Sequence, residues 1–434
     1  MSKKKVLIIT YYWPPSGGGG VQRWLKFVKY LPEFGWEPIV FTPENPEFDL
    51  KDNSLLKDVN PNLEVIKFPI WEPFSFYKKI FKKKDKLKQG IVIEKSKMTL
   101  VDKFSIWVRA NLFIPDPRRF WIKPSVDFLV PFIKEQAIDV VITTGPPHSM
   151  HLIGHSIKKK CDIKWVADFR DPWSEWDVLD KLNVSGFVRR IHKNLEKKVI
   201  DNADLTLTVS NRLAQSLASK VDNSKVEVIT NGVDHTDLEL GNQDVSGSKF
   251  RISHMGLLNE VRDPNTLWTV LEELCREEYS FQQDLEIVLA GMVSESILDR
   301  LKNSAELASC LNHLDYISHK EVFSYYKSSS VLLLLLNQSE NAKWILPGKL
   351  FEYLLADKPI LTLGEEESDV RDILLEANAG DVFAFDDSNK IKTMILQSYY
   401  AYKNGSLNSN SKNTDQFLRK NLTEKLAKLL NTLA

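Results

Sequence analysis

The sequence of 434 residues has only three cysteines, and they are odd in number and widely spaced. Cys161, Cys275 and Cys310 form neither a metal-ligand pattern nor a disulfide framework, which indicates a reducing compartment. Long apolar runs are also missing. The longest purely aliphatic one, Val331–Leu336, is far shorter than the roughly 18 residues that a membrane-spanning helix requires. Neither charge dominates, since 58 basic residues balance 58 acidic ones, which argues against a dedicated nucleic-acid-binding protein.

The N-terminus has only part of the pattern of a targeting segment. Three lysines, Lys3 to Lys5, precede the apolar stretch Val6–Trp13, as in a short signal peptide. Two prolines and four glycines then follow where a small-residue cleavage site is expected. We therefore interpret Val6–Trp13 as the start of the first strand of a cytoplasmic protein.

Short apolar runs alternate with helical patterns along nearly the whole chain. Hydrophobic residues make up 43% and charged residues 27%, as in packed globular proteins. Most of the runs lack polar alternation, which is typical of strands covered on both faces of a parallel sheet. The expected strands are Val6–Thr10, Pro38–Thr42, Glu64–Phe68, Asp139–Thr144, Lys164–Phe169, Leu205–Ser210, Val226–Thr230, Phe250–Gly256, Leu285–Gly291, Val331–Asn337, Pro359–Gly364 and Asp381–Phe385.

So many strands are too many for one comfortable sheet. We predict an α/β protein with two Rossmann-like, doubly wound parallel-sheet domains. The first covers residues 1–230, with an insertion at about 69–124 that is aromatic, basic and punctuated by prolines. A polar linker, 231–249, leads to the second domain, 250–403. A second polar stretch, 404–413, precedes a final amphipathic helix within 414–434.

The insertion contains a concentrated positive charge. Its segment Tyr77–Lys88 holds seven lysines and one aspartate, with phenylalanines at positions 74, 76 and 81. One interpretation is a solvated surface helix. The other is an anchor for an anionic membrane surface, in which Lys82, Lys83 and Lys84 contact headgroups while the aromatic rings lie at the interface.

A glycine-rich loop follows the first strand. Pro14–Gly20 ends in four consecutive glycines, and a helix is expected over Val21–Leu31. Glycines let a ligand approach the backbone closely, and the helix N-terminus favours anions. The loop matches neither the dinucleotide-binding pattern G-x-G-x-x-G nor a P-loop. We interpret it as a ligand-facing loop of another kind.

Two later strands of the first half also end in polar residues, at the edge where parallel sheets bind ligands. After the first, His148 in Thr143–His151 is a candidate ligand contact or proton carrier, or alternatively a packing residue. After the second, Val166–Trp176 combines Asp168, Arg170 and Asp171 with two tryptophans. Asp168 and Arg170 are interpreted either as residues of a polar cleft with aromatic walls, typical of sugar sites, or as an ion pair closing the sheet edge.

The second half has two comparable strand-to-helix junctions. Arg262 lies in His254–Pro264, near a helix start, where a phosphate-binding arginine is expected. Pro347-Gly348 opens the helix within Leu346–Leu354, whose first amides are suited to a diphosphate. Glu352 lies one turn into this helix, where a carboxylate accepts hydrogen bonds from ribose hydroxyls or merely complements the helix dipole.

Four segments, PPSGGGGVQRW, ADFRDPW, TNGVD and PGKLFEYLLADKPIL, together resemble the GT-B glycosyltransferases of family four. These are retaining, nucleotide-sugar-dependent enzymes of cell-surface polysaccharide assembly. The resemblance covers nearly the whole chain. It implies an N-terminal acceptor domain, a C-terminal donor domain, a cleft between them, and a final helix that crosses back onto the first domain.

The resemblance also implies roles for individual residues. Gly19 and Gly20 match a glycine pair near the donor phosphate, Arg262 a basic diphosphate contact, and Glu352 the ribose-binding glutamate. Lys349 and its neighbour Leu350 complete the expected donor site, while Asp168, Arg170 and His148 are the catalytic candidates. The chain departs from the family pattern at Trp344, where a glutamate is common, at Leu257, where a basic residue is common, and at Arg170, where a histidine is common.

The expected function is transfer of a sugar from a nucleoside diphosphate sugar to a glycan or lipid-linked acceptor with retention. Since no carboxylate cluster has a DxD-like pattern, we predict that the reaction needs no metal and no other cofactor. The partners are then the nucleotide-sugar donor, the acceptor and an anionic surface at the inner face of the cell membrane, without nucleic acid. Two alternatives stay open: a nucleotide-sugar epimerase of the same fold, and a catalytically silent sugar-nucleotide-binding or scaffold subunit.

Overall fold

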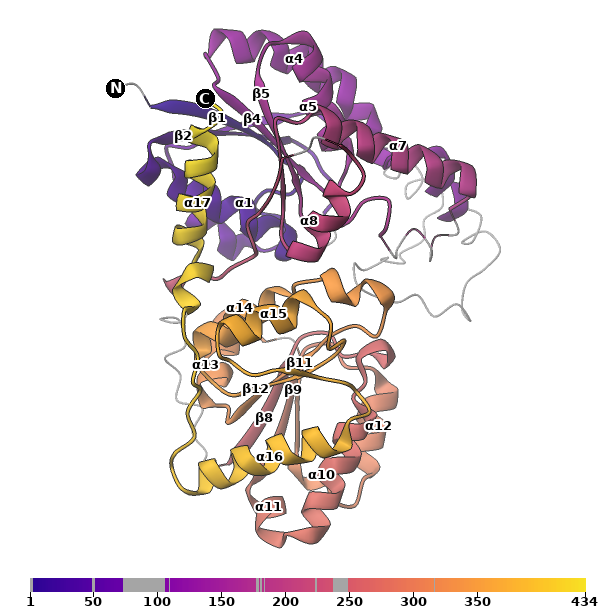
Figure 1. Cartoon of the computed structure of the whole chain (residues 1–434), viewed down its shortest axis with the longest axis vertical. Coiled ribbons are helices and arrows are strands. Elements are labelled where there is room, and N and C mark those ends of the chain that lie inside the picture. Colours follow the sequence, from indigo (N-terminus) through magenta and orange to yellow (C-terminus); the bar gives the residue numbers. More distant parts are fainter. Residues whose placement is uncertain are drawn as a thin grey trace. The chain divides into compact units, whose positions relative to one another are not determined.

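The computed structural model describes residues 3–48, 51–72, 106–108, 110–176, 179, 182, 184–222, 225–236, 249–315 and 317–434. The chain divides into two compact units, one formed by Met1–Thr230 with Arg419–Ala434 and the other by Asn231–Leu418. Each unit contains a parallel sheet flanked by helices (Figure 1). The predicted class, α/β with two doubly wound parallel sheets, is therefore confirmed.

Within the described residues, the sheet of the first unit has seven strands in the order β3-β2-β1-β4-β5-β6-β7, all paired in parallel. The sequence pattern predicted each of them. The strand order reverses between β1 and β4, and ligands of open α/β sheets bind at such a switch point. The strands are β1 (Lys4–Ile9), β2 (Trp36–Pro43), β3 (Glu64–Phe68), β4 (Val140–Gly145), β5 (Lys164–Phe169), β6 (Leu205–Thr208) and β7 (Val226–Val228).

The last helix of the chain packs in the first unit, beside α1 (Gly19–Tyr30) (Figure 1). Three leucines spaced four residues apart on α17 (Arg419–Asn431) are buried in the same apolar cluster as Trp24 and Val28 of α1. This helix is shorter than the expected Thr414–Leu433, because Leu418 is extended and separates it from a 3₁₀ turn at Thr414–Phe417. The remaining long helices are α4 (Ile122–Glu135), α5 (Ser149–Lys160), α7 (Gly186–Asn202) and α8 (Asn211–Ala218).

The sheet of the second unit has six strands in its described residues, in the order β10-β9-β8-β11-β12-β13. Sequence reasoning missed β10, since its four residues, LNHL, include only two apolar side chains and are all half-buried at the sheet edge. The sequence therefore has no buried apolar run from which this strand could be predicted. The strands are β8 (Phe250–Met255), β9 (Leu285–Ala290), β10 (Leu311–Leu314), β11 (Val331–Leu335), β12 (Ile360–Leu363) and β13 (Val382–Phe383).

Helices cover both faces of the second sheet, which explains the continuous aliphatic run of β11. Leu333 and Leu335 enter the apolar cluster on the α10 face, and Leu332 and Leu334 enter the cluster on the α14 face. The helices are α10 (Asn265–Glu277), α11 (Tyr279–Asp284), α12 (Glu295–Asn303), α13 (His319–Ser328), α14 (Gly348–Ala356), α15 (Asp369–Glu376) and α16 (Ser388–Lys403).

The predicted insertion at about 69–124 is described only at its two ends. Its second end contains helical residues at 106–108 and 110–112 and a 3₁₀ helix, Pro117–Trp121, that leads directly into α4. The basic segment Tyr77–Lys88, with Lys82, Lys83 and Lys84, lies outside the described residues. In the described part of the chain, no helix combines the length and the apolar character needed to cross a membrane.

Candidate functional site

In the second unit, a lysine lies directly over a glycine of positive φ. Gly256, which follows β8, has a φ of +113°, and a Cβ atom on it would lie 2.4 Å from the Nζ atom of Lys349. Lys349 is the second residue of α14, whose N-cap is Pro347. The glycine thus serves two purposes: it adopts a backbone conformation that L side chains rarely take, and it leaves room for the ammonium group.

Arg262 carries the second positive charge of this region. It ends the 3₁₀ helix Glu260–Arg262, and its Nε donates to Oδ1 of Asn337 over 2.6 Å, at the end of β11. Its Nη1 lies 3.4 Å from the carbonyl oxygen of Leu257. Asn337 therefore positions Arg262, a role that sequence reasoning missed, although the residue was expected to end a strand at the ligand-binding edge.

The charge of Arg262 affects the protonation of Lys349. Burial and the nearby Arg262 lower the pKa of Lys349 to about 8, and burial lowers the pKa of Arg262 as well. Among the described residues, neither side chain forms an ion pair with a carboxylate. Two adjacent cations at a helix N-terminus without a bound carboxylate have the electrostatics of an anion site, and a phosphate group would relieve their repulsion.

The remaining predicted donor residues of α14 differ in their surroundings. The Glu352 carboxylate accepts a hydrogen bond of 2.8 Å from the hydroxyl of Tyr326, a buried residue of α13 whose pKa burial raises. This bond fixes the carboxylate one turn from Lys349. Leu350, by contrast, has a fully buried side chain, and its amide donates to the carbonyl oxygen of Pro347. The structure therefore places Leu350 in the core that supports the helix.

His254 on β8 completes the surroundings of Lys349. It is buried, and its Nδ1 lies 3.0 Å from the carbonyl oxygen of Leu333, so this nitrogen carries the proton. Burial and the adjacent Lys349 lower its pKa to about 3. A neutral imidazole thus lies beside the two cations and adds no third charge to them.

In the first unit, Arg170 connects the loops after β1 and β4. Its guanidinium donates to the carbonyl oxygens of Gly20 (2.9 Å) and Pro146 (2.7 Å), and its Nε donates to Oγ1 of Thr144 (3.1 Å). A Cβ atom on Gly20 would lie 2.7 Å from the guanidinium nitrogen of Arg170. A larger residue at position 20 would therefore displace the Arg170 side chain. Gly19 is exposed, with open space around it, and leaves its backbone accessible.

Asp168 is fully buried and has three donors of its own. Its carboxylate accepts hydrogen bonds from Nη2 of Arg23 (3.0 Å), Nε1 of Trp24 (2.7 Å) and Oγ1 of Thr144 (2.9 Å). The alternative of an ion pair between Asp168 and Arg170 was therefore wrong, because Asp168 pairs with Arg23 of α1. The segment VQRW, which contains Arg23 and Trp24, belongs to the family resemblance, but its sequence does not indicate that these residues contact Asp168.

His148 has both ring nitrogens buried without a hydrogen-bond partner in the described structure. Its ring stacks on Trp173, with centroids 4.5 Å apart and planes within 2°. Burial and the neighbouring His151 lower its pKa well below the ordinary value, so the imidazole is neutral. In the segment after β5, burial raises the pKa of Asp171. A neutral imidazole and a carboxyl group can both form hydrogen bonds with a hydroxyl group.

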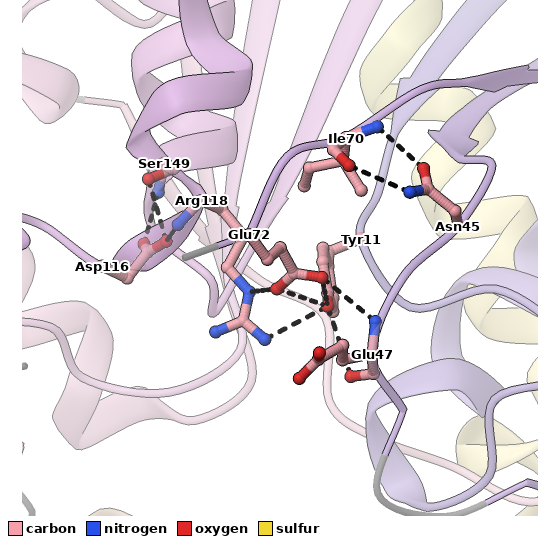
Figure 2. A network of polar contacts seen from close by, with 8 residues as sticks. All are labelled: Tyr11, Asn45, Glu47, Ile70, Glu72, Asp116, Arg118 and Ser149. Carbon is pink, nitrogen blue, oxygen red and sulfur yellow. Dashed lines mark hydrogen bonds and ion pairs between the residues drawn. The ribbon is translucent and has the colours of Figure 1, made fainter. Parts of the chain in front are cut away.

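A polar network that sequence reasoning missed holds the surrounding loops (Figure 2). Glu72 is buried and accepts from the hydroxyl of Tyr11 (3.0 Å) and the amide of Glu47 (3.0 Å), and it pairs with Nε of Arg118 (2.9 Å). Asp116 accepts from the amide (2.8 Å) and the hydroxyl (2.9 Å) of Ser149. The first two contacts connect the segments after β1 and β2 to Glu72, which follows β3, and the third connects Glu72 to the 3₁₀ helix Pro117–Trp121. The contacts of Asp116 fix the start of α5 beside His148.

Two parallel-sheet units, each flanked by helices, form the fold of the GT-B glycosyltransferases. Comparisons with known proteins agree. The model of Glycosyltransferase Family 4 matches residues 17–237, more than half of the chain. The chain therefore belongs to glycosyltransferase family 4, as the sequence resemblance predicted. No match was found among the curated proteins.

Solved structures with this fold cover essentially the whole chain. Sucrose-phosphate synthase from Thermosynechococcus elongatus matches with a TM-score of 0.64, 12% identity and 99% of each chain covered. A glycosyltransferase from Rickettsia africae matches with a TM-score of 0.62 and 12% identity, covering 100% of this chain and 99% of the other. The lipopolysaccharide outer core galactosyltransferase WaaB matches with a TM-score of 0.56, 12% identity and 99% of each chain covered. At these identities the likeness concerns the fold.

Proposed function

We propose that the protein transfers a sugar, with retention, from a nucleoside diphosphate sugar to a glycan or lipid-linked acceptor in cell-surface polysaccharide synthesis. The observation that carries the proposal is the pair formed by Lys349 and Arg262 at the N-terminus of α14. In this proposal the second unit binds the donor and the first unit binds the acceptor.

The proposed chemistry follows from the charges of this site. As the bond between the sugar and the diphosphate breaks, negative charge develops on the β-phosphate. Lys349, Arg262 and the first amides of α14 stabilise that charge electrostatically, because they are already oriented before the bond breaks. Glu352, fixed by Tyr326, accepts hydrogen bonds from the ribose hydroxyls. Since the protein itself supplies the positive charge, we propose that the reaction needs no metal ion.

On the acceptor side, we propose that the neutral imidazole of His148 and the carboxyl group of Asp171 orient the attacking hydroxyl. Both lie at the carboxyl edge of the first sheet, after β4 and β5. Arg170 and Asp168 act on this edge by holding its loops, as their hydrogen bonds indicate.

A screen of activated sugars tests the donor assignment. UDP-, GDP- and other nucleotide sugars are added to the protein, and its melting temperature is measured, since a ligand that binds only the native state raises it. The nucleotide that stabilises the wild type is expected to stabilise Lys349→Met much less. Release of the nucleoside diphosphate by wild type then separates an enzyme from a silent binding subunit, and dependence of product on acceptor separates transfer from epimerisation. A wild type that no nucleotide sugar stabilises would refute the proposal.

We also propose that the protein works at the inner face of the cell membrane, where a lipid-linked acceptor is held. The motivation is the charge of Tyr77–Lys88, since each lysine near an anionic membrane contributes about 1 kcal/mol, screened by salt. Replacing Lys82, Lys83 and Lys84 by glutamine should weaken salt-sensitive binding to anionic vesicles while donor binding is kept. Equal vesicle binding of wild type and triple variant would contradict this role for the lysines.

A further inference from the structure

The first unit exposes large apolar side chains near both ends of the predicted insertion. Trp71 is 59% exposed, Leu112 57% and Phe120 42%. The rings of Trp71 and Phe120 meet edge to face with centroids 4.8 Å apart, and Phe113 lies 6.0 Å from Phe120. Trp71, Phe113 and Phe120 therefore form one aromatic cluster, in which Trp71 and Phe120 are exposed to solvent.

The backbone beneath this cluster is well anchored. Trp121, next to Phe120, is buried and donates from Nε1 to the carbonyl oxygen of Pro69 over 3.0 Å. Glu72, next to Trp71, pairs with Arg118 in the buried network of Figure 2. Hydrogen bonds and an ion pair thus hold both sides of the cluster in place. The exposure of Trp71 and Phe120 is a property of an ordered surface, and exposed aromatic rings on such a surface are typical of interaction sites.

Other apolar side chains of the first unit are also exposed. Trp107 is 43% exposed and Phe187, at the start of α7, is 72% exposed. The two regions are linked by a hydrogen bond of 2.9 Å from the amide of Ser185 to Oδ1 of Asn111. We refer to the contacting rings of Trp71, Phe113 and Phe120 as the aromatic surface; Trp107, Leu112 and Phe187 are further exposed apolar residues of the same unit.

Positive charge accompanies the aromatic surface. Arg119 is exposed and its guanidinium carbon lies 6.0 Å from the ring of Phe120, and the exposed Arg190 and Lys193 follow Phe187 on α7. The sequence between Trp71 and Trp107 is itself basic, since residues 73–105 contain ten lysines and three acidic residues. Residues 73–105 therefore have a net charge of +7, whereas the rest of the chain has a net charge of −7.

We propose that the aromatic surface docks on an anionic lipid bilayer, with its rings inserted at the level of the headgroups and its basic residues on lipid phosphates. Tryptophan and phenylalanine side chains of membrane-surface proteins bury their apolar rings at the boundary between headgroups and acyl chains. Cationic residues beside them add electrostatic attraction to anionic lipids. The proposal rests on the proposed function, in which the first unit takes a lipid-linked acceptor. It adds an apolar contribution, assigned to described residues, that salt does not screen.

The test compares two double variants that remove the same kind of exposed side chain. Trp71→Ser with Phe120→Ser removes the centre of the aromatic surface. Tyr279→Ser with Leu375→Ser, at positions 74% and 53% exposed in the second unit, is the matched control. Co-sedimentation is measured with phosphatidylcholine vesicles, with and without phosphatidylglycerol, at low and high salt. Melting temperature and nucleotide-sugar binding are recorded for every variant.

Wild type and control should bind the anionic vesicles, while the Trp71/Phe120 variant should bind at least about tenfold more weakly, at unchanged melting temperature and unchanged donor binding. High salt should weaken wild-type binding without reducing it to the level of the variant. The proposal is overturned if both double variants bind vesicles like the wild type, or if the wild type binds none. It is also overturned if the wild type self-associates and the only effect of the Trp71/Phe120 double variant is to abolish that self-association. Donor binding is measured separately, so failure here is distinct from failure of the proposed transfer.

Discussion

Replacing Gly256 by alanine is expected to affect stability and donor binding through two separate physical effects. The first is conformational, because the residue has a φ of +113°. The second is local, because the added Cβ would lie 2.4 Å from Nζ and 2.9 Å from Cε of Lys349. The end of a lysine side chain is flexible, so the ammonium group moves away at little cost. The backbone strain is therefore expected to lower the free energy of unfolding. The displacement of Lys349 is expected to weaken the affinity for a diphosphate.

The size of each effect follows from the structure. A non-glycine residue in a sparsely populated region of positive φ costs about 1–3 kcal/mol, which sets the loss in the free energy of unfolding. Displacing the Lys349 ammonium removes a charge-assisted hydrogen bond to the donor, worth about 1.5–3 kcal/mol. Since about 1.4 kcal/mol corresponds to a factor of ten, the dissociation constant of the nucleoside diphosphate should rise at least about tenfold.

A matched control separates the two effects. Gly380 has a φ of +126°, but its added Cβ would meet only the carbonyl oxygen of Ile360, at 3.4 Å. Gly380→Ala should therefore lose stability like Gly256→Ala in urea unfolding, yet bind the nucleoside diphosphate like the wild type in titration calorimetry. If Gly256→Ala binds it with wild-type affinity, or if Gly380→Ala loses as much affinity, the assignment of Lys349 to the donor phosphate is wrong.

Three further outcomes are expected. Because the pKa of Lys349 is lowered from 10.5 to about 8, the folded chain binds fewer protons than the unfolded chain between these values. Stability should therefore rise with pH in that window while diphosphate affinity falls, and Lys349→Arg should flatten both profiles in urea unfolding and calorimetry. Glu352→Ala should weaken nucleotide-sugar binding by about 1–3 kcal/mol, and unchanged affinity in a folded variant would remove Glu352 from the donor site. Asp168→Asn leaves the Arg23 guanidinium buried without its carboxylate, so urea unfolding should show a loss of about 3–5 kcal/mol; a loss below about 1 kcal/mol would contradict the buried pair.

The sequence predicted those parts of the fold that depend on local apolar patterns. The uninterrupted run around Leu333 required burial on both faces, and β11 is covered on both. β10 was missed because a four-residue edge strand buries too little to leave a pattern. The polar partners of the site were missed for a different reason. Arg23 and Asp168 are 145 residues apart in the sequence, and Tyr326 and Glu352 are 26 residues apart. Local sequence patterns do not encode contacts over such separations.

The residue types that hold a loop are the same as those that hold a ligand, and only their partners distinguish the two uses. Asp168 and Arg170 have the composition expected of a sugar site, but each has three hydrogen bonds to the protein. Lys349 and Arg262 have the same kind of charge and no carboxylate partner among the described residues, at a helix terminus that favours anions. We therefore expect the binding energy for a phosphate to come from the second unit, whereas Asp168 and Arg170 of the first unit hold the loops at its sheet edge.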